Sequence, residues 1–554
     1  MLILPLLTTL ALPGILGAQA AATAPAQYSG KYTLSGVVVS SSTARPVENA
    51  SVSLHAAVDG RLVGEMTTGE DGSFSFPNLA AAKYSLTGSH RGYITSSYDE
   101  HAEYSTAIVT GEGLVSEGLT FRLPPQAIIY GTVTDDSGDP VEQAQVSLYR
   151  QDTLGGMGTI VRTQQTNTDD EGAYEIRHLE PGDYYVSVTA RPWYSTKPQR
   201  LNVDGTPIPD GTRSPLDVAF PRAYYADVTD PNAATPVPVK PGDHIAVNFT
   251  LHPVPAVHLT IQLPQRALSA QGNIGFSMPQ IQQDVFGNED PVPVSASFAG
   301  SDPQGPKTME VTGLAPGEYQ VELLSGRGTA THISTINATS DLKIDSSSSS
   351  SLAEVSGKLA MADGGKIPGR VMVRLRSREV RFPNGAPVAE DGSFTLHAVP
   401  PGSYELMAGS QSGSALAVAH MSASGATVDG HMLVVGNEPV LVAATLVQGS
   451  SNITGVAKRN KKPAAGVMVL LIPKDSAADR MLYRRDQSDS DGSFLLPRVI
   501  PGDYVLVAIQ DGWDLDWARP GVIAHYLPGG LPVRVSAQSD KTIALPQAVE
   551  VQAK

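Results

Sequence analysis

The sequence predicts an all-β protein, built as a tandem array of Ig-like β-sandwich domains. Three observations lead to this prediction. The 554 residues include 53 glycines and 42 prolines, while helical patterns are scarce, which is typical of many short strands joined by turns. A chain of this length exceeds one hydrophobic core, so several domains are expected. The third observation is a strand–turn–strand sequence that occurs four times.

Each copy of this repeat has an acidic residue and a glycine at a turn, an aromatic residue two positions later, and a tyrosine at a fixed distance after the glycine. Glycine adopts positive φ at no steric cost, as a tight turn requires. The tyrosine follows a second turn, usually Pro-Gly, and resembles the tyrosine corner of β-sandwiches, whose ring packs in the core while its hydroxyl caps the backbone. The glycine and tyrosine pairs are Gly72 and Tyr84, Gly172 and Tyr184, Gly392 and Tyr404, and Gly492 and Tyr504.

The spacing of the repeats predicts the domain boundaries. Gly72 and Gly172 are 100 residues apart, as are Gly392 and Gly492, which indicates an array of similar domains. A further segment keeps Pro316-Gly317 and Tyr319 but lacks an Asp-Gly turn, so it is predicted to be a divergent β-sandwich. Residues 346–351 are all serine and predict a flexible linker. The five predicted domains are residues 28–125, 126–252, 253–345, 352–446 and 447–554.

The first residues predict export from the cytoplasm. Residues 1–17 are apolar, and Ala18-Gln19-Ala20 fits a cleavage site, so we expect residues 1–20 to be a signal peptide. The alternatives are a short membrane anchor or a misplaced start, because no lysine or arginine precedes the apolar run and Pro5 and Pro13 interrupt it. No later stretch approaches the ~20 apolar residues of a transmembrane helix, so no membrane span is expected in the mature chain.

The overall charge and the cysteine count exclude several kinds of partner and site. A net charge of -16 argues against binding to nucleic acid or to an anionic membrane surface. The absence of cysteine removes disulfides, thiolate metal sites and a cysteine nucleophile. We expect a protein that is secreted, periplasmic or at the cell surface.

The order of short motifs within the repeats resembles the carboxypeptidase regulatory-like domain. In the second domain the motifs are Gly131-Thr132-Val133, Pro140-Val141, Ala144-x-Val146-x-Leu148, the Asp-Gly-type turn at Gly172 and Pro181-Gly182-Asp183-Tyr184. The resemblance covers the first, second, fourth and fifth domains well and the third in part. It implies a transthyretin-like (prealbumin-like) sandwich, a class grouped with carbohydrate-binding-like folds. The whole chain also resembles the multi-domain secreted bacterial proteins of this family.

The sequence gives no sign of a catalytic site. The 12 histidines are scattered singly, and the zinc motif His-Glu-x-x-His is missing. No Gly-x-Ser-x-Gly elbow and no P-loop are present. We therefore expect no enzyme activity and no cofactor, although an enzyme with an unrecognised site remains an alternative.

Acidic turns offer candidate calcium ligands. Asp486, Asp489 and Asp491 alternate around one turn, and Asp169, Asp170 and Glu171 occupy the corresponding place in the second domain. Alternating carboxylates supply the hard oxygen ligands that calcium prefers. Because the full ligand spacing of a calcium loop is missing, ordinary turn chemistry is the favoured interpretation and no metal site is predicted.

Aromatic residues outside the strand alternation are the candidate binding residues. Sugar rings stack on flat aromatic faces, and nearby carboxylates or amides bind sugar hydroxyls. The alternative is that each ring packs beneath a loop, as we expect for the corner tyrosines. The candidate carbohydrate-binding residues are Trp193, Tyr194, Tyr224, Tyr225, Trp513, Asp514, Asp516 and Trp517.

Taken together, these features predict a non-catalytic, secreted or cell-envelope binding protein, with polysaccharide as the preferred ligand. The alternative is a structural spacer or assembly module that holds another envelope protein by strand addition.

Overall fold

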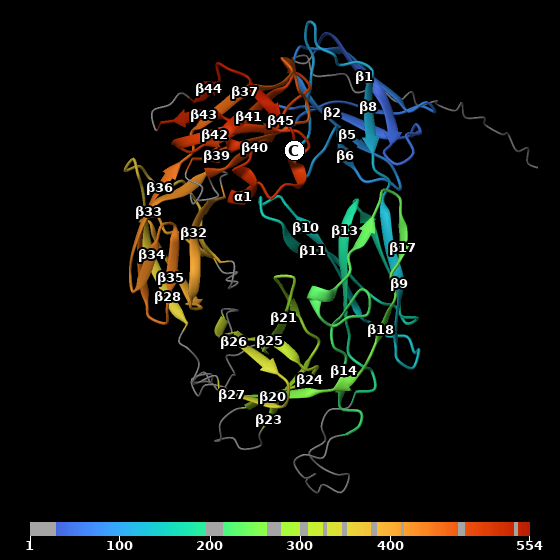
Figure 1. Cartoon of the computed structure of the whole chain (residues 1–554), viewed down its shortest axis with the longest axis vertical. Helices are drawn as coiled ribbons and strands as arrows, with labels where there is room; N and C mark the ends of the chain where they lie inside the picture. Colours follow the sequence, from blue (N-terminus) through green and yellow to red (C-terminus); the bar gives the residue numbers. More distant parts are fainter. Residues whose placement is uncertain are drawn as a thin grey trace, which may run out of the picture. The chain divides into compact units, whose positions relative to one another are not determined.

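The computed structural model describes ten segments of the chain and is built almost entirely of β-strands (Figure 1). This confirms the predicted all-β fold. The structure forms two compact units. The smaller comprises the described residues up to Arg91 together with Thr95–Tyr98 and Ala107–Leu123, and the larger comprises the rest. The described residues are 29–195, 214–262, 279–299, 308–324, 330–345, 352–377, 385–411, 415–474, 482–536 and 541–554.

The smaller unit is the first sandwich, made of two sheets. Strands β2 (Ser51–Ala56) and β5 (Lys83–Ser89) alternate buried and half-buried residues, as expected for strands with one face on a core. Tyr98 packs edge-on against Phe121 in this core, with 5.9 Å between ring centroids. One sheet has the order β4 (Ser73–Leu79), β1 (Ser29–Ser40), β8 (Leu119–Leu123). The other has the order β3 (Leu62–Thr67), β2 (Ser51–Ala56), β5 (Lys83–Ser89), β6 (Ser96–Ser97), with β7 (Ile108–Val109) also on β5.

The second sandwich belongs to the larger unit. Its core contains Val146, Leu148, Val186 and Val188, which come from two paired strands and are all fully buried. One sheet has the order β12 (Ala173–Leu179), β9 (Ala127–Asp135), β17 (His244–Ala246), with β18 (Phe249–Leu251) also on β9. The other has the order β11 (Thr159–Asn167), β10 (Gln145–Asp152), β13 (Gly182–Thr189), β15 (Ala223–Tyr224), with β16 (Val237–Val239) on β13. A separate two-stranded sheet pairs β14 (Val218–Ala219) with β19 (Val254–Pro255), and a 3₁₀ turn spans Pro231–Ala233.

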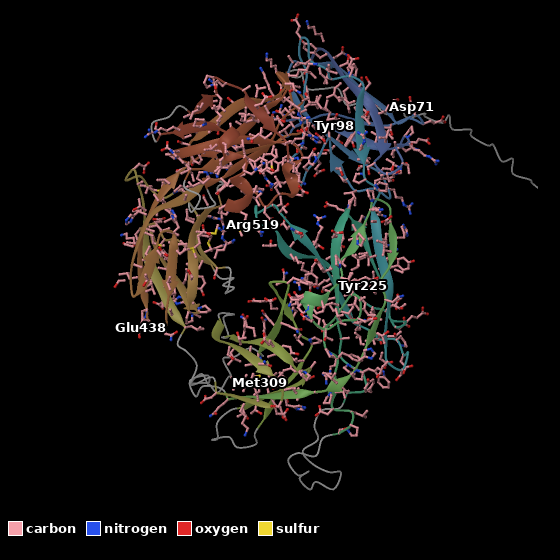
Figure 2. All side chains as sticks on the ribbon, in the orientation of Figure 1. Asp71, Tyr98, Tyr225, Met309, Glu438 and Arg519 are labelled. Carbon is pink, nitrogen blue, oxygen red and sulfur yellow. The ribbon has the colours of Figure 1, made fainter. Side chains whose placement is uncertain are left out.

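The third sandwich lacks the Asp-Gly turn but keeps two four-stranded sheets around a core. Met309, labelled in Figure 2, is fully buried in this core. One sheet has the order β23 (Ser295–Ala299), β24 (Thr308–Leu314), β20 (Val257–Gln262), β27 (Leu342–Asp345). The other has the order β22 (Asn288–Pro291), β21 (Gln280–Val285), β25 (Gly317–Leu324), β26 (Ala330–Ala338).

The fourth sandwich encloses a core that runs from Ala353 to Leu446. One sheet has the order β31 (Ser393–Val399), β28 (Ala353–Met361), β36 (Val440–Gln448), β33 (Leu416–Ser424). The other has the order β30 (Gly385–Pro387), β29 (Val371–Arg376), β32 (Gly402–Ser410), β35 (Met432–Val435), β34 (Ala426–Asp429).

In the fifth sandwich a single strand, β45 (Val549–Gln552), pairs with both layers and joins them into one nine-stranded sheet. Strand β39 (Met468–Pro473) is buried along its whole length, because both of its faces are covered. The main path is β38 (Lys462–Pro463), β37 (Ser451–Arg459), β45, β42 (Gly502–Ile509), β39 (Met468–Pro473), β40 (Arg484–Gln487). Strands β41 (Ser493–Val499) and β44 (Thr542–Ala544) lie on β37, and β43 (Leu531–Val535) lies on β42. The helical segments here are α1 (Pro520–Ile523) and 3₁₀ turns at Gly512–Asp514 and Leu527–Gly529.

All five sandwiches share one strand pairing. The opening strand runs antiparallel to one neighbour and parallel to the closing strand, as in the pairing of β28 with β31 and β36. In the four copies with an Asp-Gly-type turn, the turn glycine has φ between 71° and 86°. At Gly392 an added Cβ would lie 2.2 Å from the Leu359 carbonyl oxygen, and the Leu359 N–H donates to the Gly392 carbonyl at 2.8 Å. The predicted requirement for glycine is therefore confirmed.

The predicted tyrosine corner occurs in every sandwich. In each, the tyrosine hydroxyl donates to the backbone carbonyl four residues earlier. Tyr84 does so although its Pro-Gly turn is replaced, because the acceptor, Ala80, precedes that turn. The pairs are Tyr84–Ala80 at 3.1 Å, Tyr184–Glu180 at 2.9 Å, Tyr319–Ala315 at 2.6 Å, Tyr404–Pro400 at 2.8 Å and Tyr504–Ile500 at 2.6 Å.

Two predicted segments lie outside the described residues: the signal peptide at 1–20 and the serine linker at 346–351. In the part of the chain that the structure describes, none of the helices has the length and apolar character needed to cross a membrane.

Candidate functional site

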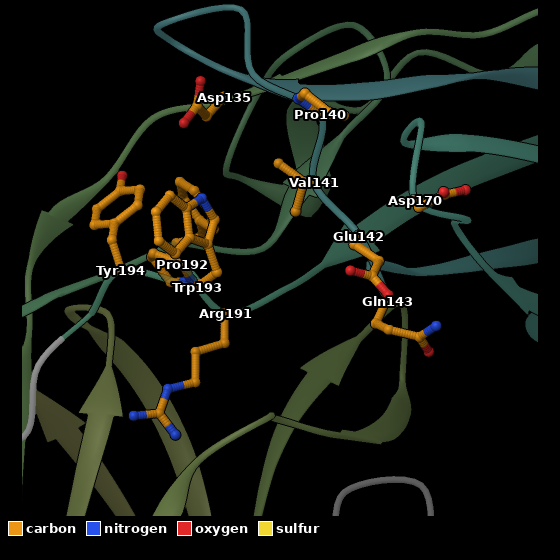
Figure 3. Close-up of a pocket in the computed structure, with 11 residues that line it drawn as sticks. Asp135, Pro140, Val141, Glu142, Gln143, Asp170, Arg191, Pro192, Trp193 and Tyr194 are labelled. Carbon is orange, nitrogen blue, oxygen red and sulfur yellow. The ribbon is translucent and has the colours of Figure 1, made fainter.

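A hollow of about 400 Å³ opens at one end of the second sandwich (Figure 3). Because Gln145 pairs with Thr189, the residues before β10 and those after β13 meet at this end. The end of β9 and the Asp-Gly-type turn before β12 complete the wall. The described lining residues are Asp135, Pro140, Val141, Glu142, Gln143, Asp170, Arg191, Pro192, Trp193, Tyr194 and Phe220. The hollow is at the small end of the range of ligand pockets.

Trp193 dominates one side of this hollow, which we call the Trp193 hollow. Trp193 is 83% exposed. Among the large apolar residues that are exposed in the described part of the chain, it is the most exposed aromatic residue. Tyr194 supports it edge-on, with 5.7 Å between ring centroids and 84° between ring planes. Figure 3 shows both rings across the hollow from Glu142, Gln143 and Asp170. An exposed indole in a hollow provides a flat apolar face that a ligand can cover.

The other groups of the hollow are mainly oxygen acceptors. The Asp135 carboxylate is buried and accepts the backbone N–H groups of Ser137 at 2.9 Å and Asp139 at 3.0 Å. Partial burial, with the nearby charges of Asp135 and Asp136, raises the pKa of the Tyr194 hydroxyl, which therefore stays protonated at neutral pH. Such a hydroxyl both donates and accepts hydrogen bonds. The described lining residues include no histidine, serine, cysteine or lysine.

The second predicted site, around Trp513 and Trp517, is packed against other parts of the larger unit. The Trp513 ring stacks on His101 with 5.1 Å between centroids and 10° between planes. The Arg485 guanidinium lies over three rings, 4.8 Å from Tyr104, 5.7 Å from Trp513 and 5.3 Å from Trp517. Trp517 is only 8% exposed. The faces that would stack on sugar are therefore covered by protein.

The acidic residues of this loop are also engaged. The Asp516 carboxylate accepts the N–H of Gly158 at 2.6 Å, and Lys554 Nζ lies 2.6 Å from the Asp514 carboxylate. Gly158 belongs to the connection between β10 and β11, and Thr153 in the same connection donates to the Trp513 carbonyl at 3.1 Å. The loop thus holds other segments of the chain. The predicted sugar site at Trp513, Asp514, Asp516 and Trp517 stays a prediction, while the contacts of these residues favour a role within the chain.

The tyrosine pair of the second domain lies away from the hollow. Tyr224 is fully buried, and its ring meets Phe286 edge-on at 5.6 Å. Burial raises its pKa, so the hydroxyl is neutral. Tyr225 is half-buried and packs on the core of the second sandwich. Neither of them lines the hollow, and Tyr224 has no free face for a sugar.

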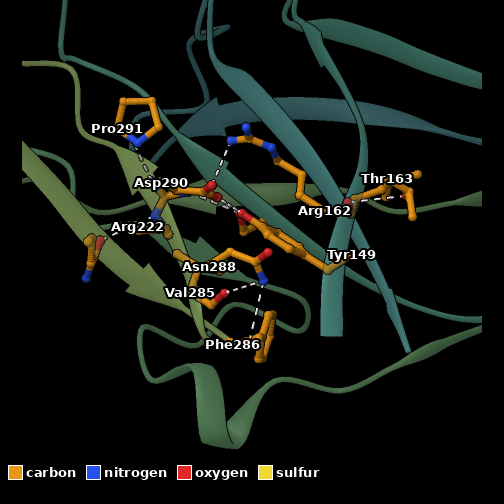
Figure 4. Close-up of polar contacts among 12 residues, drawn as sticks. Tyr149, Arg162, Thr163, Arg222, Val285, Phe286, Asn288, Asp290 and Pro291 are labelled. Atoms are coloured by element: carbon orange, nitrogen blue, oxygen red, sulfur yellow. Dashed lines mark hydrogen bonds and ion pairs between the residues drawn. The ribbon is translucent and has the colours of Figure 1, made fainter. Parts of the chain in front are cut away.

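A buried charged cluster between the second and third sandwiches escaped the sequence analysis (Figure 4). Asp290 is 2% exposed, and its carboxylate lies 2.6 Å from Arg162 Nη1 and 3.7 Å from Arg222 Nη1. The Tyr149 hydroxyl also donates to Asp290. Burial raises the pKa of Tyr149 to about 12. The cluster joins segments far apart in sequence, which local patterns do not reveal.

Four of the six candidate calcium residues, Asp169, Asp486, Asp489 and Asp491, accept hydrogen bonds at or beside the turn. Asp491 Oδ1 accepts the Ser493 N–H at 2.9 Å, and Asp486 Oδ2 accepts the Leu495 N–H at 2.7 Å. Asp489 Oδ2 accepts a longer bond from the Ser493 hydroxyl at 3.4 Å. In the second sandwich Asp169 Oδ1 accepts N–H groups at 3.0 and 2.8 Å. Across the described segments, no three histidine, aspartate or glutamate side chains gather closely enough to hold a metal ion.

Comparison with known proteins identifies a domain family for the first two sandwiches. Residues 33–118 and 128–219 match the model of the carboxypeptidase regulatory-like domain. No curated protein matches the chain.

Three of the solved structures that match the chain differ in the extent of the match. The TIE protein of Bacillus anthracis is 15% identical, with 57% of this chain and 50% of that chain covered and a TM-score of 0.17. The minor pilin of Streptococcus agalactiae is 14% identical, with 41% of this chain and 97% of that chain covered and a TM-score of 0.20. The shaft pilin of Lactobacillus rhamnosus GG is 9% identical, with 40% of this chain and 98% of that chain covered and a TM-score of 0.18. The chain thus spans half the length of the first, and TM-scores this low carry no inference about function.

Proposed function

Because residues 33–118 and 128–219 are carboxypeptidase regulatory-like domains, we propose that the chain is a non-catalytic binding protein of the cell exterior. We propose further that the second of these domains binds polysaccharide in the Trp193 hollow. The observation that supports this proposal is the 83% exposure of an indole inside a hollow rather than in a core. The predicted signal peptide supports the extracytoplasmic location.

The chemistry of the hollow suits a sugar. The apolar C–H face of a pyranose ring packs on the indole of Trp193, which removes apolar surface of both from water. The Glu142 and Asp170 carboxylates and the Gln143 amide lie across from that face and can accept hydrogen bonds from hydroxyl groups. A few polar groups around an aromatic platform orient such a ligand.

A second function, that of a structural spacer or assembly module, is favoured by a different observation. The contacts of Trp513, Trp517 and Arg485, and the cluster around Asp290, use aromatic and charged side chains to join segments within the larger unit. A chain stiffened in this way could hold another envelope protein at a sheet edge by strand addition.

A glycan array with the full chain separates the two functions. We expect binding that Trp193→Ala abolishes and that a chelator leaves unchanged. Leu441→Ala is the matched control, because Leu441 is a large exposed apolar residue of the fourth sandwich, 61% exposed. Equal binding by the Trp193→Ala variant would place the ligand elsewhere. An array without signal would favour the spacer function, and a search for a protein partner would follow.

A further inference from the structure

The described lining of the Trp193 hollow has more acidic than basic side chains. Three carboxylates line it, those of Asp135, Glu142 and Asp170, whereas Arg191 is its one cationic residue among the described lining residues. Glu142 and Asp170 are exposed, and no hydrogen bond or ion pair joins their side chains to another described residue. Their charges therefore face whatever enters the hollow.

The single cation is directed elsewhere. Arg191 Nε donates to the Ser195 hydroxyl at 3.2 Å, and Arg191 Nη1 donates to the hydroxyl of Ser295 on β23 of the third sandwich. Figure 3 shows its guanidinium extending away from the indole and from Glu142. Arg191 consequently contributes its aliphatic stem to the wall, while its charge is held at the neighbouring sandwich.

An exposed indole opposite carboxylates is suited to a cation. The face of tryptophan attracts a positive charge more strongly than that of tyrosine or phenylalanine. Carboxylates nearby add attraction for an ammonium group and repel a second carboxylate.

We propose that the Trp193 hollow selects polysaccharides with free amino groups, such as polymers of glucosamine, over neutral and uronic-acid polysaccharides. This inference rests on the proposed function and narrows its ligand class. The sugar ring covers the indole of Trp193, and its ammonium group is placed toward Glu142 and Asp170.

The test compares three oligosaccharides of equal length: those of glucosamine, N-acetylglucosamine and galacturonic acid. The first two share a backbone and differ in whether the amine of each sugar is free or acetylated. Affinities for the full chain are measured by calorimetry at mildly acidic pH, at which the free sugar amine is protonated. We expect the glucosamine oligomer to bind most tightly and the galacturonic acid oligomer to show no binding.

Variants assign the preference to named side chains. Glu142→Gln and Asp170→Asn should each weaken binding of the glucosamine oligomer by about two- to fivefold, the range of an exposed ion pair. Binding of the N-acetylglucosamine oligomer should weaken less in each variant, because the amide oxygen that replaces the carboxylate still accepts a hydrogen bond from a sugar hydroxyl group. Trp193→Ala should weaken both by about tenfold or more, as for an aromatic residue at the centre of a binding site. Glu438→Gln, which removes an exposed carboxylate of the fourth sandwich labelled in Figure 2, is the matched control and should change nothing.

The possible failures are distinguishable. If the N-acetylglucosamine or galacturonic acid oligomer binds as tightly as the glucosamine oligomer, and Trp193→Ala abolishes this binding, the amine preference is overturned and the proposed function stands. If none of the three binds, and glycans in general give no signal, both are overturned. If oligolysine binds through Trp193 as well as the glucosamine oligomer does, the hollow recognises amines irrespective of the sugar, which overturns the proposed ligand class.

Discussion

The hydroxyl of Tyr504 donates to the carbonyl oxygen of Ile500, 2.6 Å away, and the same bond occurs at the corner of all five sandwiches. In the fifth sandwich both residues are buried, so this bond closes a turn that water does not reach. The ring supplies packing and the hydroxyl supplies the bond, and the two contributions can be separated by mutation.

Replacement of Tyr504 should destabilise the fifth sandwich in two steps. Tyr504→Phe removes the hydroxyl and should lower the free energy of unfolding by about 0.5–1.5 kcal/mol. Tyr504→Ala also removes the ring and should lower it by about 3–5 kcal/mol. Denaturant unfolding followed by tryptophan fluorescence reports on this sandwich, because Trp513 and Trp517 belong to it. Equal stability of the alanine variant and the parent would exclude Tyr504 from the core.

The corner tyrosines should make the protein less stable in alkali. Burial raises the pKa of Tyr504 and of Tyr319 to about 12, above the value of 10.0 for a free tyrosine. Between pH 10 and 12 the unfolded chain therefore loses protons that the folded chain retains. This contribution to stability is complete below pH 10 and is lost as the pH rises toward 12. Tyr504→Phe should show a shallower loss over this range in pH-dependent unfolding of the fifth sandwich, and an unchanged slope would contradict the assignment.

Two glycines of the fourth sandwich should respond differently to alanine. Gly392 and Gly364 both have positive φ, 86° and 72°. An added Cβ at Gly392 would lie 2.2 Å from the Leu359 carbonyl oxygen, whereas at Gly364 it would meet nothing within 4 Å. Gly364→Ala should therefore cost only the backbone strain, about 1–2 kcal/mol, and Gly392→Ala should cost more. Hydrogen exchange in residues 352–446 measures both, and equal effects would show that the close approach does not matter.

Removal of Asp290 should be far more costly than removal of Arg162. Asp290→Ala leaves Arg222, whose side chain is 1% exposed, without its carboxylate, and breaking such a buried pair costs about 3–5 kcal/mol. Arg162 is 36% exposed, so water can replace part of its interaction and Arg162→Ala should cost less. Hydrogen exchange of β10, β11, β21 and β22 is the measurement. A neutral Asp290→Ala variant would mean that the cluster does not hold these strands.

Trp513 should act within the chain rather than on a ligand. Trp513→Ala removes the ring that stacks on His101 and lies beneath Arg485. We expect faster hydrogen exchange in Asp99–Thr106 and unchanged affinity for glycans. A loss of glycan binding without faster exchange would contradict this prediction and support the sugar site that the sequence suggested.

The sequence predicts structural features formed by residues that are close together in the chain. It does not predict contacts between residues that are far apart in the chain. The residues that form the glycine turn, and those that form the tyrosine corner, lie within a few positions of one another in the sequence. Both features occur in the structure as expected. Trp193 and Trp513 look alike in sequence, since each is an aromatic residue in a polar loop. Their difference arises from partners such as His101 and Arg485, which only the folded chain brings to Trp513. In the same way, Tyr149 and Asp290 are 141 positions apart, and no periodic pattern links them.

The opening strand of each sandwich pairs in parallel with its closing strand, so the sheet that contains both can be completed only after the closing strand has been synthesised. In the fifth sandwich β37 pairs with β44 and β45, and β45 also pairs with β42. Residues 549–552 must therefore emerge before this sheet can close, and the corresponding delay applies to the closing strand of each of the other sandwiches. Such non-local pairing slows folding and leaves the opening strand with an unpaired edge in the meantime.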